Sequence, residues 1–120
     1  MGEYRDVAAK LREPSKSLRA AMPEAYSAFG ALHQATTGDG AISAKTKELI
    51  ALAISVVKQC DGCIANHARA AAKQGATAEE VAETLGVALL MAGGPATVYG
   101  PRAWEAFHEF AGIDLPGASA

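Results

Sequence analysis

The stretch that decides the fold class is GCIANHARAAAKQGATAEEVAETLGVALLMAGGP, residues 62–95. Its first part predicts a helix that ends at Gly75. Thr77 and Glu80 then have the spacing of a capping box, which starts a second helix that runs to the glycine pair at Gly93. This half of the chain therefore predicts two consecutive helices and no strand.

The other segments carry similar helix start and stop signals. We expect helices over residues 4–12, from Pro23 through PEAYSAFGALHQA, after the cap Ser43, from about Asp61, and from about Pro95 through WEAFHEF. Pro14 is expected to stop the first helix, and Gly100-Pro101 to break or kink the last. The chain has no internal repeat and no low-complexity linker. Residues 1–120 thus predict one all-α domain, a bundle of about six helices with a loose tail at 116–120.

Composition and charge exclude several classes of partner. The chain has 120 residues, a net charge of −2 and scattered basic residues, so electrostatics favour neither nucleic acid nor an anionic membrane as a partner. The opening MGEYRDVAAKLREP lacks the apolar core of a signal peptide, and no apolar run reaches the roughly 18 residues of a membrane span. We therefore expect a cytoplasmic protein. Thiols stay reduced there, and a close cysteine pair is more often catalytic, redox-active or metal-binding than structural.

Two segments are more apolar than a small domain needs. Leu49–Val57 and Val81–Met91 are apolar on more than one face, whereas a surface helix has one apolar stripe. One of them can be a central helix that the others surround. Alternatively, both bury surface against another subunit, because obligate interfaces resemble a domain core cut in half. The second interpretation is favoured, and we expect a homo-oligomer.

Both cysteines of the chain share a helix face with a histidine. Cys60, Cys63 and His67 are separated by three, four and seven residues, which places them on one stripe. The helix begins at or beside the cysteines. Unpaired backbone N–H groups and the helix dipole favour a thiolate at such a position.

The preceding helix carries polar residues within its apolar run. Glu48, Ser55 and Gln59 fall on a narrow stripe that also contains Leu52. If this stripe faces His67, the Glu48 carboxylate can take a proton from the imidazole, directly or through water. The imidazole can then take one from a thiol. Alternatively, Glu48 is a solvated residue in the first turn of its helix.

Other interpretations of the cysteine pair remain open at this point. The cysteines can be inert core residues, because free cysteine packs as a small hydrophobe. Cys60, Cys63, His67 and Glu48 can also form a zinc site, although structural zinc sites usually draw ligands from separated turns. Haem attachment would require a histidine directly after the second cysteine, where this chain has Ile64.

These residues carry a resemblance to a known family. The pattern Glu48, eleven residues, Cys60-Asp-Gly-Cys63, three residues and His67 resembles the alkylhydroperoxidase D-like branch of the carboxymuconolactone decarboxylase family, over about residues 45–94. The resemblance implies an all-α fold that assembles as trimers or hexamers, with active sites close to subunit contacts. It also implies reduction of small hydroperoxides, or dithiol-disulfide exchange with a lipoyl-type or other thiol donor. No cofactor and no resident metal are implied.

The resemblance also assigns roles. Cys63 matches the cysteine that attacks peroxide, Cys60 matches the one that resolves the sulfenic acid into a disulfide, and His67 and Glu48 match the proton relay. Gly62 departs from the pattern, because the peroxidase members have a second histidine there; this bears on peroxidase turnover and on the donor. The main prediction is a thiol oxidoreductase. The alternatives are a non-enzymatic redox sensor, a zinc-binding oligomer, or a decarboxylase-like enzyme, the last disfavoured because the family's decarboxylases lack the cysteine pair.

Overall fold

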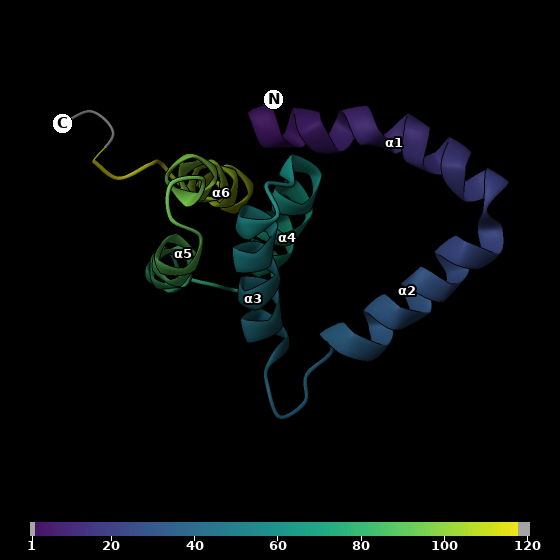
Figure 1. Ribbon diagram of the computed structural model, residues 1–120, viewed down its shortest axis with the longest axis horizontal. Coiled ribbons are helices and arrows are strands. Elements are labelled where there is room, and N and C mark those ends of the chain that lie inside the picture. Colours follow the sequence, from purple (N-terminus) through teal and green to yellow (C-terminus); the bar gives the residue numbers. More distant parts are fainter. Residues whose placement is uncertain (1, 118–120) are drawn as a thin grey trace.

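The computed structural model describes residues 2–117, which form helices and no strand (Figure 1). The six helices are α1 (Glu3–Ala21), α2 (Pro23–Thr37), α3 (Ala44–Val57), α4 (Asp61–Lys73), α5 (Ala78–Ala92) and α6 (Ala96–Ala111). This confirms the predicted all-α class and the number of helices. Of the predicted tail, residues 116 and 117 lie in a turn and residues 118–120 lie outside the described part of the chain.

Helices α3 to α6 pack into the body of the molecule. Leu52 of α3, Ile64 of α4, Val81 of α5 and Phe107 of α6 are at most 1% exposed and belong to one core cluster. Small side chains on α4 let the neighbouring helices approach it closely. They belong to Ala65, Ala68 and Ala71, each of which is at most 1% exposed. The helix that carries the dithiol is thus held between α3 and α6.

Helices α1 and α2 form an arm that leaves this body. Figure 1 shows α1 crossing one end of α4 and continuing past it, and α2 turning back toward the start of α3. Tyr4 is the one fully buried residue of α1, and α2 has no buried residue. Phe29 and Leu32 on α2 are 66% and 57% exposed. The arm therefore has an apolar face that this chain by itself does not cover.

Pro14 does not end its helix and Pro101 does not break its helix, so the predicted stop at Pro14 is wrong. Helix α1 continues through Pro14 to Ala21, and α6 contains Pro101 within its length. A proline removes the hydrogen bond to the carbonyl four residues earlier. In α1 that carbonyl belongs to Lys10, and residues 10–14 are all exposed, so water can take the place of the missing donor.

The predicted helix starts agree with the structure. Ser43 accepts a hydrogen bond from the backbone N–H of Thr46 and caps α3. Thr77 and Glu80 form the reciprocal capping box of α5. Gly93 ends α5 at φ +68°, in the left-handed region that glycine adopts without strain. These local signals set the start of α3 and both ends of α5.

The broad apolar segments remain partly uncovered in the single chain. Ile54 on α3 is 53% exposed, and Leu90 and Met91 on α5 are 79% and 77% exposed. The alternative of a central helix surrounded by the others is therefore wrong for both segments. None of the helices within residues 2–117 combines the length and the apolarity that crossing a membrane requires.

Candidate active site

The two cysteines lie where α4 begins. Cys60 is the N-cap of this helix, and its Sγ accepts a hydrogen bond of 3.2 Å from the backbone N–H of Cys63. The pair is held as a disulfide. Cys60 is half-buried, whereas Cys63 is exposed. Both sulfur atoms therefore lie beside the positive end of the α4 dipole, which favours a thiolate once the pair is reduced.

His67 lies one turn further along α4 and pairs with a carboxylate from α3. Its Nδ1 is 2.7 Å from Oε1 of Glu48. Glu48 is only 6% exposed, so its partner is the imidazole and not bulk solvent. This is the direct pairing that helical spacing predicts, and the interpretation of Glu48 as a solvated first-turn residue is wrong.

The contact also selects the nitrogen of His67 that is free to exchange protons. With Nδ1 engaged by Glu48, Nε2 is left to accept or release a proton. The imidazole is 21% exposed, which gives a substrate or a water molecule access to it. A buried carboxylate on Nδ1 also stabilises the imidazolium that forms when Nε2 takes up a proton. The pair thus has the geometry of a general acid–base.

The rest of the predicted polar stripe on α3 does not join this pair. Ser55 is buried, but its hydroxyl donates to the carbonyl of Ala51 in its own helix at 2.7 Å. Gln59 lies beyond the end of α3, is exposed, and has a φ of 56°. Helical spacing does not apply to Gln59, because the chain has already turned toward Cys60. Of the three polar residues on the stripe, Glu48 alone contacts His67.

A second polar cluster at the start of α4 is not evident from the sequence. Asp61, which lies between the cysteines, accepts a hydrogen bond of 3.1 Å from the Tyr4 hydroxyl. Its other oxygen is 3.3 Å from Nη1 of Arg102. Tyr4 is 57 residues away in the chain and Arg102 is 41 residues away, so no local spacing connects them. The acidic residue within the dithiol motif is a sequence signal that could have drawn attention to this cluster, but it does not indicate its partners.

The comparison with protein families covers the helices that carry Glu48, the two cysteines and His67. A model of the carboxymuconolactone decarboxylase family matches residues 23–108. The chain belongs to this family. An uncharacterized protein of Cupriavidus necator is 39% identical over 105 residues, which cover 85% of this chain and 93% of the relative.

Solved structures show the same fold for other members of the carboxymuconolactone decarboxylase family. The apo form of a family protein from Legionella pneumophila superposes with a TM-score of 0.87 at 45% identity, covering 90% of this chain and 96% of its own. A Thermotoga maritima member, with a suggested involvement in antioxidative response, gives a TM-score of 0.71 at 31% identity, covering 83% and 88%. The fold prediction is therefore confirmed by relatives as well as by the structure.

The position where this family member departs from the peroxidase pattern lies under α1. A Cβ atom on Gly62 would be 3.0 Å from Cδ1 of Leu11. Leu11 is 47% exposed, so its side chain can shift to admit a small substituent. A side chain as large as histidine would have to displace Leu11 from this place. Glycine at position 62 therefore leaves room for α1 to pass close to the start of α4.

The zinc alternative finds no support in the geometry. Within residues 2–117, no group of three or more His, Cys, Asp or Glu side chains is arranged to hold a metal ion. Glu48 and His67 are bonded to each other, and the cysteines are bonded to each other. The four predicted residues thus form two bonded pairs in this structure.

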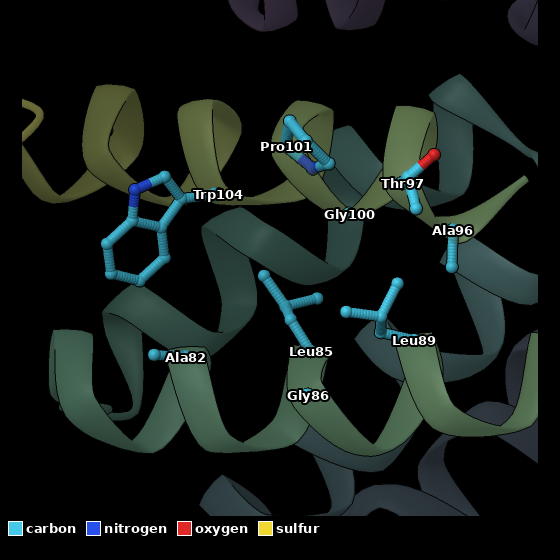
Figure 2. Close-up of a pocket in the computed structure, with 9 residues that line it drawn as sticks. All are labelled: Ala82, Leu85, Gly86, Leu89, Ala96, Thr97, Gly100, Pro101 and Trp104. Carbon is cyan, nitrogen blue, oxygen red and sulfur yellow. The ribbon is translucent and has the colours of Figure 1, made fainter. Parts of the chain in front are cut away.

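An apolar hollow of about 480 Å³ lies apart from the cysteines, between α5 and α6. Figure 2 shows Leu85 and Leu89 pointing into it from α5, with Pro101 and Trp104 on the α6 side. Its lining includes neither a cysteine nor His67. It has no polar group suited to the chemistry of the dithiol. We therefore assign it to the uncovered apolar surface of the chain and not to the reacting site.

Proposed function

We propose that this protein is a thiol-dependent oxidoreductase that reduces small hydroperoxides, or exchanges disulfides with a dithiol donor, without a cofactor. The observation that carries the proposal is the Cys60–Cys63 disulfide at the start of α4, one helical turn from the paired His67 and Glu48. A cysteine pair that only filled the core would be buried, whereas Cys63 is exposed. Dithiol, proton carrier and helix dipole thus meet at an accessible place.

In the first step of the proposed reaction, the Cys63 thiolate attacks the terminal oxygen of the hydroperoxide. An S–O bond forms, the O–O bond breaks, and the sulfur becomes a sulfenic acid. The leaving alkoxide takes a proton from the His67 imidazolium, which had received it from the Cys63 thiol. Glu48 stabilises the imidazolium between the two transfers.

The second step closes the disulfide seen in the structure. The Cys60 thiol attacks the sulfenic sulfur of Cys63, the S–S bond forms, and water leaves. An external dithiol of the lipoyl type, or another thiol donor, then supplies two electrons and two protons by disulfide exchange. This restores both thiols and completes the cycle.

One rapid-mixing experiment tests this function. Reduced protein mixed with excess tert-butyl hydroperoxide is expected to lose two thiols per chain. Metal analysis of the same preparation is expected to find no stoichiometric zinc. Zinc bound at one per chain with protected thiols would support the metal-binding alternative instead. Thiols that persist in metal-free protein would contradict the oxidoreductase and favour a sensor or a decarboxylase-like enzyme.

We also propose that the working form is a homo-oligomer larger than a dimer, a trimer or a hexamer. The single chain exposes 7578 Å² of surface, whereas a compact monomer of this mass exposes about 6,100 Å². The surplus is about twice the ~800 Å² that one partner contributes to a standard interface. Two contact patches per subunit are what a closed ring requires.

Two groups of uncovered apolar residues suit two such patches. One is the exposed apolar face of α2 that carries Phe29 and Leu32. The other is α5 with Leu90 and Met91, next to the hollow between α5 and α6. Because α2 has no buried residue in its own chain, we expect its apolar face to pack against a neighbouring subunit.

Charges on the apolar face of α2 should therefore dissociate the assembly. Sedimentation of the parent at micromolar concentration is expected to give a mass above that of a dimer of 12.3 kDa chains. Phe29→Asp with Leu32→Asp should reduce this mass, because a buried unpaired carboxylate is strongly unfavourable. Ser27→Asp with Gln34→Asp, on the opposite face of the same helix, should leave it unchanged. A parent that sediments at 12.3 kDa would overturn the oligomer, and an unaffected double variant would exclude α2 from the interface.

A further inference from the structure

Three helices meet on the carboxylate of Asp61, the residue that follows the first cysteine. Asp61 is the first residue of α4, and its Oδ1 accepts a hydrogen bond of 3.1 Å from the Tyr4 hydroxyl of α1. Its Oδ2 lies 3.3 Å from Nη1 of Arg102 on α6. The acidic group of the dithiol motif is thus held from two sides by residues distant in the chain.

Tyr4 is fixed in place, so the contact is a defined one. Tyr4 is 1% exposed. The Glu109 carboxylate on α6 accepts hydrogen bonds from the backbone N–H of Tyr4 at 3.0 Å and of Arg5 at 2.8 Å, which anchors the first turn of α1. Burial, and then the charge of Asp61, raise the pKa of Tyr4. The phenol therefore stays protonated and donates to Asp61 at neutral pH.

The side on which Asp61 is held matters for the sulfur atoms. Residues two apart on a helix face nearly opposite directions, so the side chains of Asp61 and Cys63 leave α4 on different sides. A carboxylate free to swing toward the sulfurs would oppose the formation of a thiolate. Arg102 offsets the same charge, and its guanidinium lies over the ring of Tyr99 at 4.6 Å. The other carboxylate described at this site, that of Glu48 on α3, is bonded to His67 of α4.

We propose that Tyr4 is a positioning residue for the dithiol: with Arg102, it holds the Asp61 carboxylate on the side of α4 away from Cys63, so that this charge does not oppose the thiolate. The inference rests on the proposed function, in which Cys63 is the reacting thiol. Tyr4 contacts neither sulfur nor substrate, and it acts through Asp61. It also connects the arm, which begins at α1, to the chemistry at the start of α4.

Alkylation of the reduced protein by iodoacetamide, followed against pH, tests this positioning role without using peroxide. Tyr4→Phe should move the midpoint of the profile upward and slow alkylation below it by about threefold, the size expected for a solvent-screened charge a few ångströms nearer the sulfur. Asp61→Asn should move the midpoint downward. Tyr4→Phe combined with Asp61→Asn should match Asp61→Asn alone. Tyr99→Phe, which removes a hydroxyl elsewhere on α6, is the matched control and should match the parent.

The outcomes separate this inference from the proposed function. A Tyr4→Phe profile identical to the parent, with only lower stability, would make Tyr4 a structural anchor and overturn the inference even if peroxide is reduced. A shifted profile in a protein that does not consume peroxide would retain the positioning role and reject the peroxidase. If Tyr4→Phe does not fold, Arg102→Gln should slow alkylation in the same direction and Arg102→Lys should restore it. An unchanged Arg102→Gln profile would then overturn the inference.

Discussion

Reduced Cys63→Ser is expected to lose its reaction with hydroperoxide by about 10³-fold or more, the scale of removing a nucleophile. A serine hydroxyl is not appreciably ionised at neutral pH, so the nearby dipole and imidazole cannot make it a comparable nucleophile. The exposure of Cys63 supports this assignment, since the attacking sulfur must meet the peroxide. Stopped-flow mixing with tert-butyl hydroperoxide under pseudo-first-order conditions measures the rate.

Cys60→Ser is the matched control, and it should fail differently. It keeps the attacking sulfur, so it should react once and then stop as a sulfenic acid at Cys63, which dimedone traps and mass spectrometry locates. Because Cys60 is half-buried and caps α4, its replacement by serine, also a good cap, should leave the helix intact. An adduct in Cys63→Ser but not in Cys60→Ser would reverse the two roles.

Glu48→Gln is expected to slow the reaction with peroxide at neutral pH by ~10²-fold, the low end for a lost acid–base group. The amide keeps the shape and can still accept from Nδ1 of His67, 2.7 Å away in the parent, so the fold and the oligomer should survive. The amide does not stabilise an imidazolium, so His67 becomes a poorer acceptor of the thiol proton. Much of the loss should return at high pH, where the thiolate forms without help.

Glu79→Gln, an exposed glutamate in the first turn of α5, is the control for the loss of a charge near a helix start. It should change stability by only a few tenths of a kcal/mol and leave the kinetics unchanged. A pH–rate profile of Glu48→Gln that superimposes on that of the parent would remove Glu48 from the site. His67 would then act alone.

Prediction from sequence worked best where the deciding interactions are local. The helix caps at Ser43 and Thr77 and the glycine end of α5 are interactions between residues three or four positions apart. Such local interactions form in the same way whatever the tertiary fold. The shared face of Cys63 and His67 follows from helical spacing in the same way, and Cys60 joins Cys63 from the N-cap position just before the helix. The contact of Glu48 with His67 was also predicted, because consecutive helices joined by a short turn have few ways to pack.

The prolines and the rest of the polar stripe show where local rules fail. Pro14 costs its helix a hydrogen bond wherever it lies, but the cost depends on whether water reaches the orphaned carbonyl, and that depends on the surroundings of α1. Ser55 was predicted to lie on the polar stripe with Glu48, yet its hydroxyl bonds to a carbonyl of its own helix. Both outcomes depend on solvent access and on competition among partners, which a linear pattern does not contain.

The sequence by itself therefore determined the helices, their boundaries near the site, and the row of thiols and imidazole at the start of α4. Tertiary structure alone decided that α1 crosses that helix end, that Leu11 lies over Gly62, and that Tyr4 and Arg102 converge on Asp61. The physical reason is range. Caps and helical periodicity act within a turn or two of the backbone, whereas these contacts join residues 41 to 57 positions apart. They form only when the burial of Tyr4 and of the core residues has fixed how the helices pack.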